Sequence, residues 1–238
     1  MTIRCVLMDI EGTIIPIAFV RKVLFPYAQQ GMAAFLRERR EDPAVHRWTA
    51  LCQDTVVQEA GVRPDYDELP NILHRWMEQD RKHTGLKGLQ GMIWEVGYRT
   101  GAFAPALYDD VYSSLIAWQA NGLRLALYSS GSEQAQRLLL AHTTEGNLTS
   151  LFTHYFDTRV GSKTDPESYR RIAQLLALSA DPILFLSDVE AELDAAAAAG
   201  LKTTQIVRPG TQAGSRHPIV SSFHDLTMSN FAQPTPCL

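Results

Sequence analysis

The chain has 238 residues, of which 45% are hydrophobic and 20% charged, and its formal net charge is −4. This composition is typical of a globular protein that forms one large domain, or a core domain carrying a smaller inserted one. The sequence contains no basic block, which argues against a nucleic-acid partner, because binding to backbone phosphates needs clustered Lys and Arg.

The three cysteines, Cys5, Cys52 and Cys237, are far apart and follow no metal-ligand spacing. Cys5 lies in an apolar run and is expected in the core. No apolar stretch approaches the roughly 20 residues that a membrane span needs, and no secretory signal precedes the first strand. We therefore expect a reduced, cytoplasmic protein with no membrane partner.

An almost continuous apolar run at residues 3–10 predicts a strand that is buried on both faces, as in a parallel sheet. Similar runs at residues 123–128, 183–186 and 203–207, and a weaker one at 155–158, alternate with helical patterns. This alternation predicts an α/β fold, with a Rossmann-like, mostly parallel sheet flanked by helices. Folds of this kind bind ligands beyond the carboxyl ends of their strands.

Residues 18–100 break the alternation with long helical patterns and no convincing strand. Pro26 is expected to interrupt the first helical region, and the Trp and Met residues at helical spacing are expected in a core. We predict an all-helical cap inserted after the first strand. Residues 1–17 and 101–238 would then form the core domain.

The first predicted strand ends in the motif D-I-E-G-T at residues 9–13. Two acids spaced i, i+2 just beyond a strand can face one cavity, and Gly12 allows a close turn. Asp9 is suited to attack a phosphorus atom or to bind a cation, and Glu11 to give or take a proton. Taken alone, the motif is equally consistent with a structural turn.

The motif S-S-G-S at residues 129–132 follows the second strand and precedes a helical pattern. Hydroxyls and backbone N–H groups at a helix N-terminus form an anion site. The alternative is an ordinary N-cap, because serine is a preferred capping residue. The two interpretations are compatible if Ser132 caps the helix while Ser129 and Ser130 face a ligand.

Lys163 lies in a polar loop, where a lysine is usually solvated, and Pro166 suits the first turn of a following helix. An acid-rich site that also holds a phosphate dianion needs a cation, which gives this lysine a candidate role. Asp188 directly follows the fourth strand and is suited to bind Mg²⁺ together with Asp9. Glu192, four residues later, either supports the site or is exposed.

In this order along the chain, these motifs resemble those of the haloacid-dehalogenase superfamily of phosphatases. The resemblance implies that Asp9 forms a phospho-aspartate and that Glu11 is the general acid/base. It implies that Ser129 and Lys163 hold the phosphoryl group. It also implies one Mg²⁺ per chain, bound by Asp9, Asp188 and the main-chain carbonyl of Glu11.

Most phosphatases of that superfamily carry Asp at the position of Glu11. Glutamate in D-I-E-G-T-x-x-P-I-A-F-V is similar to the enolase-phosphatase of methionine salvage. So are the strings L-F-P-Y, Y-S-S-G-S-E-Q-A-Q, H-T-T-E-G, H-Y-F-D-T and V-R-P-G (residues 207–210). The similarity extends over essentially the whole chain and is weakest at about residues 41–83.

The narrower resemblance implies a monomeric enzyme with a small phosphate-ester substrate, 2,3-diketo-5-methylthiopentyl-1-phosphate. The enzyme would enolise this diketone and then remove the phosphate, leaving the acireductone 1,2-dihydroxy-3-keto-5-methylthiopentene. The enolisation base stays open between Glu11, whose side chain reaches further than that of Asp, and Lys87, beside the string L-Q-G at residues 89–91.

Two other functions are consistent with parts of the sequence. One is a phosphatase of the same superfamily that acts on another small ester, such as a sugar phosphate; Glu11 and the long matching strings argue against it. The other is a non-catalytic binding or scaffold protein on this fold. It predicts the loss of at least one of Asp9, Lys163 and Asp188, and all three are present.

Overall fold

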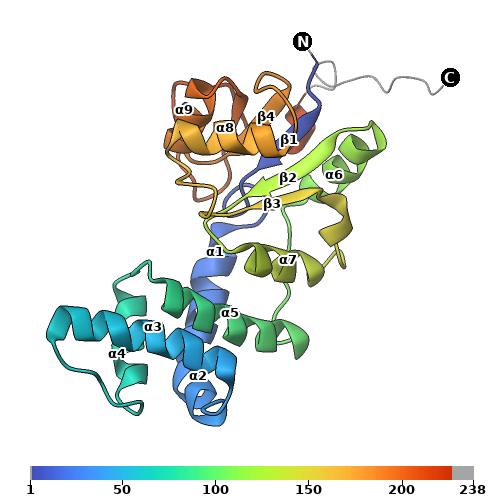
Figure 1. Ribbon diagram of the computed structural model, residues 1–238. Helices are drawn as coiled ribbons and strands as arrows, with labels where there is room; N and C mark the ends of the chain where they lie inside the picture. Colours follow the sequence, from blue (N-terminus) through green and yellow to red (C-terminus); the bar gives the residue numbers. More distant parts are fainter. Residues whose placement is uncertain (1, 227–238) are drawn as a thin grey trace. The chain divides into compact units, whose positions relative to one another are not determined.

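The structure is a computed structural model that describes residues 2–226, so that Cys237 lies outside the described residues. The chain divides into two compact units (Figure 1). The first consists of Met1–Ile17 with Ala104–Leu238, and the second is Ala18–Phe103.

The first unit is built on a sheet of six strands in the order β3-β2-β1-β4-β5-β6, and every neighbouring pair is parallel. The strands are β1 (Cys5–Met8), β2 (Arg124–Tyr128), β3 (His154–Phe156), β4 (Ile183–Ser187), β5 (Lys202–Ile206) and β6 (Ile219–Val220). The chain proceeds outward from β1 to β3 and then crosses back to β4. The point where the strand order reverses therefore lies between β1 and β4, which is where folds of this type bind ligands.

The central strands are buried on both faces, as their apolar runs predicted. All four residues of β1 and all five of β4 are buried. Alternate residues of the strands point to one face, where Leu7, Tyr128 and Phe185 pack with Tyr169 and Leu193 from the covering helices. Burial of these side chains against helices keeps the strand ends in a fixed register.

Within residues 2–226, four α-helices of the first unit flank the sheet: α6 (Val111–Ala120), α7 (Glu133–Ala141), α8 (Pro166–Leu175) and α9 (Glu190–Ala198). The described part of this unit also contains two short 3-10 helices, η2 (Thr149–Leu151) and η3 (Phe223–Asp225). The side chain of Ser132 caps α7 by accepting from the amide of Ala135 at 3.2 Å. Asp165 caps α8 in the same way, and Pro166 occupies the first turn, as expected for a residue without an N–H.

The second unit is helical throughout its regular structure. Its elements are α1 (Ile17–Phe19, which begins at the boundary), the π-helix η1 (Val20–Leu24), α2 (Phe25–Glu38), α3 (Pro43–Ala60), α4 (Leu69–Glu78) and α5 (Thr84–Arg99). Its core includes Met32, Leu73 and Trp76, with Met77, Met92, Trp48 and Trp94 packed against it. The tryptophans and methionines singled out by their helical spacing are thus packing residues.

Pro26 does not interrupt the first helical region, contrary to the expectation from sequence. It lies in the first turn of α2, which continues directly from the preceding π-helical turn. The irregularity precedes it, because Val20–Leu24 form a π-helical turn that ends with the amide of Phe25 donating to the carbonyl of Val20.

The observed strands differ from the predicted ones by a residue or two at their ends. The weak candidate at residues 155–158 is β3, shifted to His154–Phe156. Sequence gave no indication of β6, a two-residue strand in a region without an apolar run. In the described part of the chain, no helix has the length and apolar character that a membrane crossing requires.

Candidate active site

Asp9 lies one residue beyond β1, at the point of strand reversal. Its amide donates to the carbonyl of Leu186 on β4 at 2.9 Å, which extends the parallel pairing past the strand end. Its side chain is buried. The following turn is closed by the amide of Gly12 donating to the carbonyl of Ile15 at 2.8 Å. Main-chain pairing therefore fixes the position of Asp9 from both sides.

Gly12 permits the loop after β1 to approach the loop after β4. Its φ of +79° is in the left-handed region. A Cβ atom at this position would lie 2.5 Å from Oδ2 of Asp188. Glycine is required here for both reasons, and the contact places Asp188 directly against the D-I-E-G-T turn.

Lys163 is buried in the site, although its loop is polar. Its ammonium lies 2.6 Å from Oδ1 of Asp9 and 2.6 Å from Oε2 of Glu192. The hydroxyl of Tyr169 donates to the Lys163 carbonyl at 2.7 Å and fixes the backbone. Burial by itself would lower the pKa of Lys163, but the two carboxylates outweigh it and raise the pKa. The side chain therefore stays a cation.

Glu192 is part of this cluster, and the alternative that it is exposed is wrong. Its side chain is only 12% exposed. Besides the ammonium of Lys163, its Oε2 accepts a hydrogen bond from the hydroxyl of Ser187 at 2.9 Å. Burial and the charge of Asp9 raise the pKa of Glu192, against the lowering effect of Lys163. The single positive charge of Lys163 therefore contacts two carboxylates but can balance the charge of only one.

Asp188 adds a third buried carboxylate. Burial and the charge of Asp9 raise its pKa to about 6. Its Oδ1 is buried and has no hydrogen-bond partner in the described part of the protein. Its main-chain carbonyl accepts from Nε2 of Gln205 at 2.8 Å, which anchors the loop after β4 from the neighbouring strand. Three buried carboxylates and one ammonium leave the site short of positive charge.

A hard divalent cation fits this donor set. Mg²⁺ takes oxygen ligands, usually one or two carboxylates with waters and substrate phosphate, and does not require an all-protein cage. Asp9 and Asp188 provide two such carboxylates at the point of strand reversal. Among residues 2–226, no group of three or more His, Cys, Asp or Glu side chains is arranged to hold a metal ion. Two carboxylates leave the remaining coordination positions of such a cation to substrate and solvent.

The S-S-G-S loop begins at the end of β2, which pairs with β1 in register, Leu127 beside Met8. Asp9 and this loop therefore lie at the same edge of the sheet. Ser129 is buried, and its hydroxyl accepts from the amide of Gly131 at 3.1 Å. Ser130 is exposed. Ser132 is the helix cap, as one interpretation of the sequence predicted, and Ser129 and Ser130 lie in the loop before it.

The structure also shows residues of this edge that the motifs did not reveal. Gln136 is buried and donates from Nε2 to the carbonyls of Gly131 and Phe156 at 2.9 and 2.8 Å, which fixes the S-S-G-S loop. Gln205 does the same for the loop of Asp188. A buried glutamine on a helix or strand near a motif is a weak signal in sequence, since its partners are main-chain atoms of distant loops.

The two candidates for the enolisation base lie in different units. Glu11 is half-buried in the turn after β1. Lys87 is an exposed residue of α5 in the second unit. Packing explains the glycine that follows Lys87 in the L-K-G-L-Q-G string, because a Cβ at Gly88 would lie 2.4 Å from the ring of Trp48.

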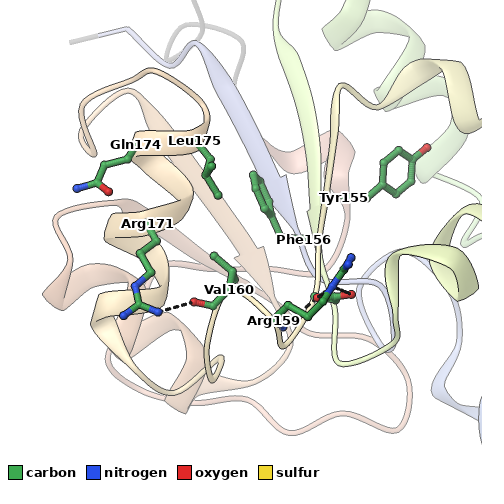
Figure 2. Close-up of a pocket in the computed structure, with 8 residues that line it drawn as sticks. Tyr155, Phe156, Arg159, Val160, Arg171, Gln174 and Leu175 are labelled. Carbon is green, nitrogen blue, oxygen red and sulfur yellow. Dashed lines mark hydrogen bonds and ion pairs between the residues drawn. The ribbon is translucent and has the colours of Figure 1, made fainter. Parts of the chain in front are cut away.

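A cavity of about 560 Å³ lies elsewhere, between β3 and α8. Figure 2 shows its lining residues, which include Phe156, Arg159 and Arg171 and none of the predicted site residues. Arg159 pairs with Asp157 at 3.0 Å, and Arg171 donates to the carbonyl of Val160 at 3.3 Å. Because both guanidinium groups are engaged with the protein, this cavity is a poor phosphate site compared with the edge at Asp9.

The geometry agrees with comparisons to known proteins. A family model described as haloacid dehalogenase-like hydrolase matches residues 3–200. Enolase-phosphatase E1 of Gluconacetobacter diazotrophicus is 50% identical over 234 residues, covering 98% of this chain and 96% of that protein. The chain belongs to the enolase-phosphatase E1 family of haloacid dehalogenase-like hydrolases. Another member of this family, from Serratia proteamaculans, is 46% identical over 231 residues, covering 97% of this chain and 99% of that protein.

A solved structure supports the same assignment of fold. The crystal structure of the UTR4 protein from Saccharomyces cerevisiae superposes with a TM-score of 0.76 at 30% identity, covering 94% of this chain and all of the yeast chain. As a member of the enolase-phosphatase E1 family, the protein is a phosphatase, and the resemblance inferred from its motifs is confirmed. Enzymes of the family generally depend on Mg²⁺.

Proposed function

We propose that this enzyme converts 2,3-diketo-5-methylthiopentyl-1-phosphate into the acireductone 1,2-dihydroxy-3-keto-5-methylthiopentene and phosphate, a step of methionine salvage. Two proteins named Enolase-phosphatase E1 are 50% and 46% identical to this chain over nearly its whole length, which supports the reaction. The observation that carries the phosphatase chemistry is the buried contact of 2.6 Å between the Lys163 ammonium and the Asp9 carboxylate, at the point where the strand order reverses.

Asp9 is the proposed nucleophile. Its carboxylate would attack the phosphorus atom in line with the leaving enol oxygen, forming an acyl phosphate on Asp9. The Lys163 ammonium, 2.6 Å from Oδ1 of Asp9, holds this carboxylate in place in the site. Lys163 and the hydroxyl or N–H donors of Ser129 and Ser130 would hold the other phosphoryl oxygens as their charge changes.

One Mg²⁺ per chain is part of the proposal. The carboxylates of Asp9 and Asp188 and the main-chain carbonyl of Glu11 would hold it. When bound, the ion would neutralise charge on the phosphoryl group and orient it. The surplus of buried carboxylates and the unpartnered Oδ1 of Asp188 support this choice.

Glu11 is the proposed general acid and base of the phosphatase half. It would protonate the leaving enol oxygen and then take a proton from the water that hydrolyses the acyl phosphate. Its half-buried position in the turn that carries Asp9 supports this role. For the preceding enolisation, Glu11 and Lys87 are the two candidates for the base that removes the proton next to the carbonyl.

We assign the catalytic core to the first unit and a substrate-selecting cap to the second. Residues 18–100 of the cap would exclude water during phosphoryl transfer and select the methylthio tail. We further propose that the enzyme acts as a monomer in the cytoplasm. Three observations are consistent with the cytoplasmic location. They are the composition, the free and buried thiols of Cys5 and Cys52, and the absence of a membrane-crossing helix among residues 2–226.

Ultraviolet monitoring of the diketone phosphate, combined with phosphate detection, tests the proposal. Wild-type enzyme with Mg²⁺ should give an enol absorbance that rises and is then replaced, with phosphate released in step. Glu11→Gln and Lys87→Met should separate the two halves: the variant that lacks the enolisation base gives no enol signal. Slow turnover of this substrate beside fast turnover of a sugar phosphate would contradict the proposed substrate.

A further inference from the structure

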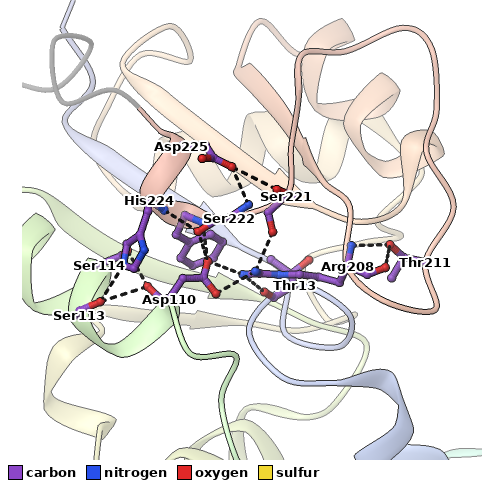
Figure 3. Close-up of polar contacts among 11 residues, drawn as sticks. Thr13, Asp110, Ser113, Ser114, Arg208, Thr211, Ser221, Ser222, His224 and Asp225 are labelled. Atoms are coloured by element: carbon purple, nitrogen blue, oxygen red, sulfur yellow. Dashed lines mark hydrogen bonds and ion pairs between the residues drawn. The ribbon is translucent and has the colours of Figure 1, made fainter.

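Arg208 belongs to the V-R-P-G segment that follows β5, a motif that the proposed mechanism does not use. Its guanidinium is buried and forms a two-point ion pair with Asp110 (Figure 3). Nη1 donates to Oδ1 of Asp110 at 2.8 Å and Nη2 to Oδ2 at 2.9 Å. A planar group held at two points has a fixed orientation.

The same guanidinium also contacts the turn that follows Asp9. Nη2 donates to the main-chain carbonyl of Thr13 at 3.3 Å, and Nη1 donates to that of Ser221 at 3.0 Å. Arg208 thus connects three segments of the first unit that are far apart in sequence: the D-I-E-G-T turn, the segment before α6, and the residues after β6. Only the first of these carries groups of the proposed mechanism.

The surroundings of Arg208 keep it rigid. Its guanidinium carbon lies 4.3 Å from the ring centre of Tyr108 and 5.3 Å from that of Phe223. Asp110 also accepts hydrogen bonds from the hydroxyl of Ser222 at 3.1 Å and from the amide of Phe223. Figure 3 shows the Ser222 hydroxyl and the Arg208 guanidinium directed at this carboxylate. Both oxygens of the Asp110 carboxylate therefore accept hydrogen bonds from protein groups.

A second contact attaches the turn to the same segment. The amide of Tyr108 donates to the carbonyl of Ile14 at 3.1 Å. Within the turn, the amides of Ile14 and Ile15 donate to the carbonyl of Ile10 at 2.9 and 3.0 Å. Because these bonds close the turn on itself, a shift at Thr13 would be transmitted to its other residues.

Stability alone is a weak reason for this arrangement. A buried ion pair is often no more stabilising than apolar side chains of the same volume, because both charges lose their hydration. The distinctive property of this ion pair is geometric. It holds the guanidinium N–H donors in a fixed orientation toward particular acceptors. Here one of those acceptors belongs to the turn that carries Asp9, and an error of about 1 Å in the position of a reacting group can reduce turnover about a hundredfold.

We propose that Arg208 is a positioning residue for phosphoryl transfer: held by Asp110, it fixes the Thr13 carbonyl and thereby the turn that presents Asp9. The inference rests on the proposed phosphatase mechanism. It concerns a residue that acts through the main chain of the turn rather than through contact with substrate.

The test compares Arg208→Lys with Ser222→Ala, using Mg²⁺ and 4-nitrophenyl phosphate below the melting temperature of each protein. Lysine keeps a cation beside Asp110 but lacks the second fixed donor for Thr13. We expect kcat to fall about ten- to a hundredfold in Arg208→Lys, with KM unchanged within about threefold. Ser222→Ala, which removes a donor to Asp110 but leaves the Thr13 contact, should keep kcat within about twofold.

A second variant addresses folding. Arg208→Met combined with Asp110→Asn removes both charges, so that neither is left buried and unpaired. We expect this protein to fold and to show the same loss of kcat. Wild-type kcat in either folded variant would overturn the inference, and so would failure of both to fold, since Arg208 would then be a structural residue.

Wild-type enzyme and Asp9→Asn, run in the same assay, separate this inference from the proposed function. If wild type releases no phosphate, or Asp9→Asn releases it normally, the proposed mechanism fails. If these two behave as expected but the Arg208 variants keep their kcat and KM, only the positioning role fails.

Discussion

The ammonium of Lys163 lies 2.6 Å from Oδ1 of Asp9, although the two residues are 154 positions apart in the sequence. Both side chains are buried, at 7% and 8% exposure. The contact holds the Asp9 carboxylate, the proposed nucleophile, beside a cation that can also bind a phosphoryl oxygen. The contact therefore relates the fold, which brings β1 and the loop before α8 together, to the first chemical step.

Replacement of Lys163 by methionine should impair both catalysis and stability. The change leaves the carboxylates of Asp9 and Glu192 buried without their common cation, and breaking a buried pair in this way costs about 3–5 kcal/mol. We expect a higher KM for phosphate esters and a kcat lower by at least about a hundredfold. Denaturant unfolding and initial-rate kinetics measure the two effects.

Lys202→Met is the matched control for that experiment. Lys202 pairs with Asp181 at 2.8 Å, but both side chains are substantially exposed, at 56% and 34%. Exposed pairs contribute about 0–1 kcal/mol. If Lys163→Met were as stable and active as Lys202→Met, Lys163 would have no role in the site.

Asp188→Asn should specifically weaken the response to Mg²⁺. In wild type, EDTA should stop phosphate release, and added Mg²⁺ should restore it and raise the melting temperature, because a ligand that binds only the folded state stabilises it. Asp188→Asn removes one of two carboxylates suited to the ion, so the Mg²⁺ concentration for half-maximal activity should rise at least about tenfold. An unchanged melting shift in this variant would exclude Asp188 from the metal site.

Glu192→Gln should act through Lys163 rather than through Mg²⁺. Glutamine can still accept the hydrogen bond from Ser187, but it is neutral and forms no ion pair with Lys163. We expect KM for phosphate esters to change by about threefold or more while the Mg²⁺ dependence stays as in wild type. A shift in Mg²⁺ dependence like that of Asp188→Asn would instead make Glu192 part of the metal site.

The contribution of Asp110 to stability should be lost in acid. Burial alone would raise the pKa of Asp110, but hydrogen bonds from Arg208 and the Phe223 amide outweigh it and hold the pKa below its ordinary value. A lowered folded-state pKa stabilises the protein above the unfolded value of about 3.9, and this contribution disappears as the pH falls through the folded-state pKa.

Unfolding by denaturant at several pH values tests this directly. The difference in the free energy of unfolding between wild type and Asp110→Asn should be largest near neutral pH and should shrink below about pH 4. The exposed neighbour Asp109 provides the control, since Asp109→Asn should have little effect at any pH. A difference for Asp110→Asn that did not depend on pH would contradict the assigned role of its charge.

Much of the fold and the positions of Asp9, Ser129 and Asp188 followed from the sequence. The apolar runs of parallel strands are distinctive because both faces are buried, and the residues just beyond them fall on one edge of the sheet. The two-residue strand β6 and the π-helical turn before Pro26 had no such pattern. Their formation depends on neighbouring strands and helices rather than on their own residues.

Tertiary contacts explain what the sequence left undecided about individual side chains. Lys163 and Glu192 each looked like solvated residues in their local segments, and their burial arises only when the loop before α8 meets α9. Likewise, Gln205 and Arg208 act on main-chain carbonyls of loops that precede them by 17 and 195 positions. Such partners carry no signal in local composition or spacing.

The central claim, that Asp9 accepts the phosphoryl group, is tested most directly by trapping the intermediate. Enzyme quenched during turnover is reduced with borohydride, which converts an acyl phosphate of aspartate into homoserine, and the modified residue is located by mass spectrometry. We predict modification at Asp9 in wild type and none in Asp9→Asn, which should be folded and release no phosphate. Modification at another carboxylate, or ordinary phosphate release by folded Asp9→Asn, would contradict the account.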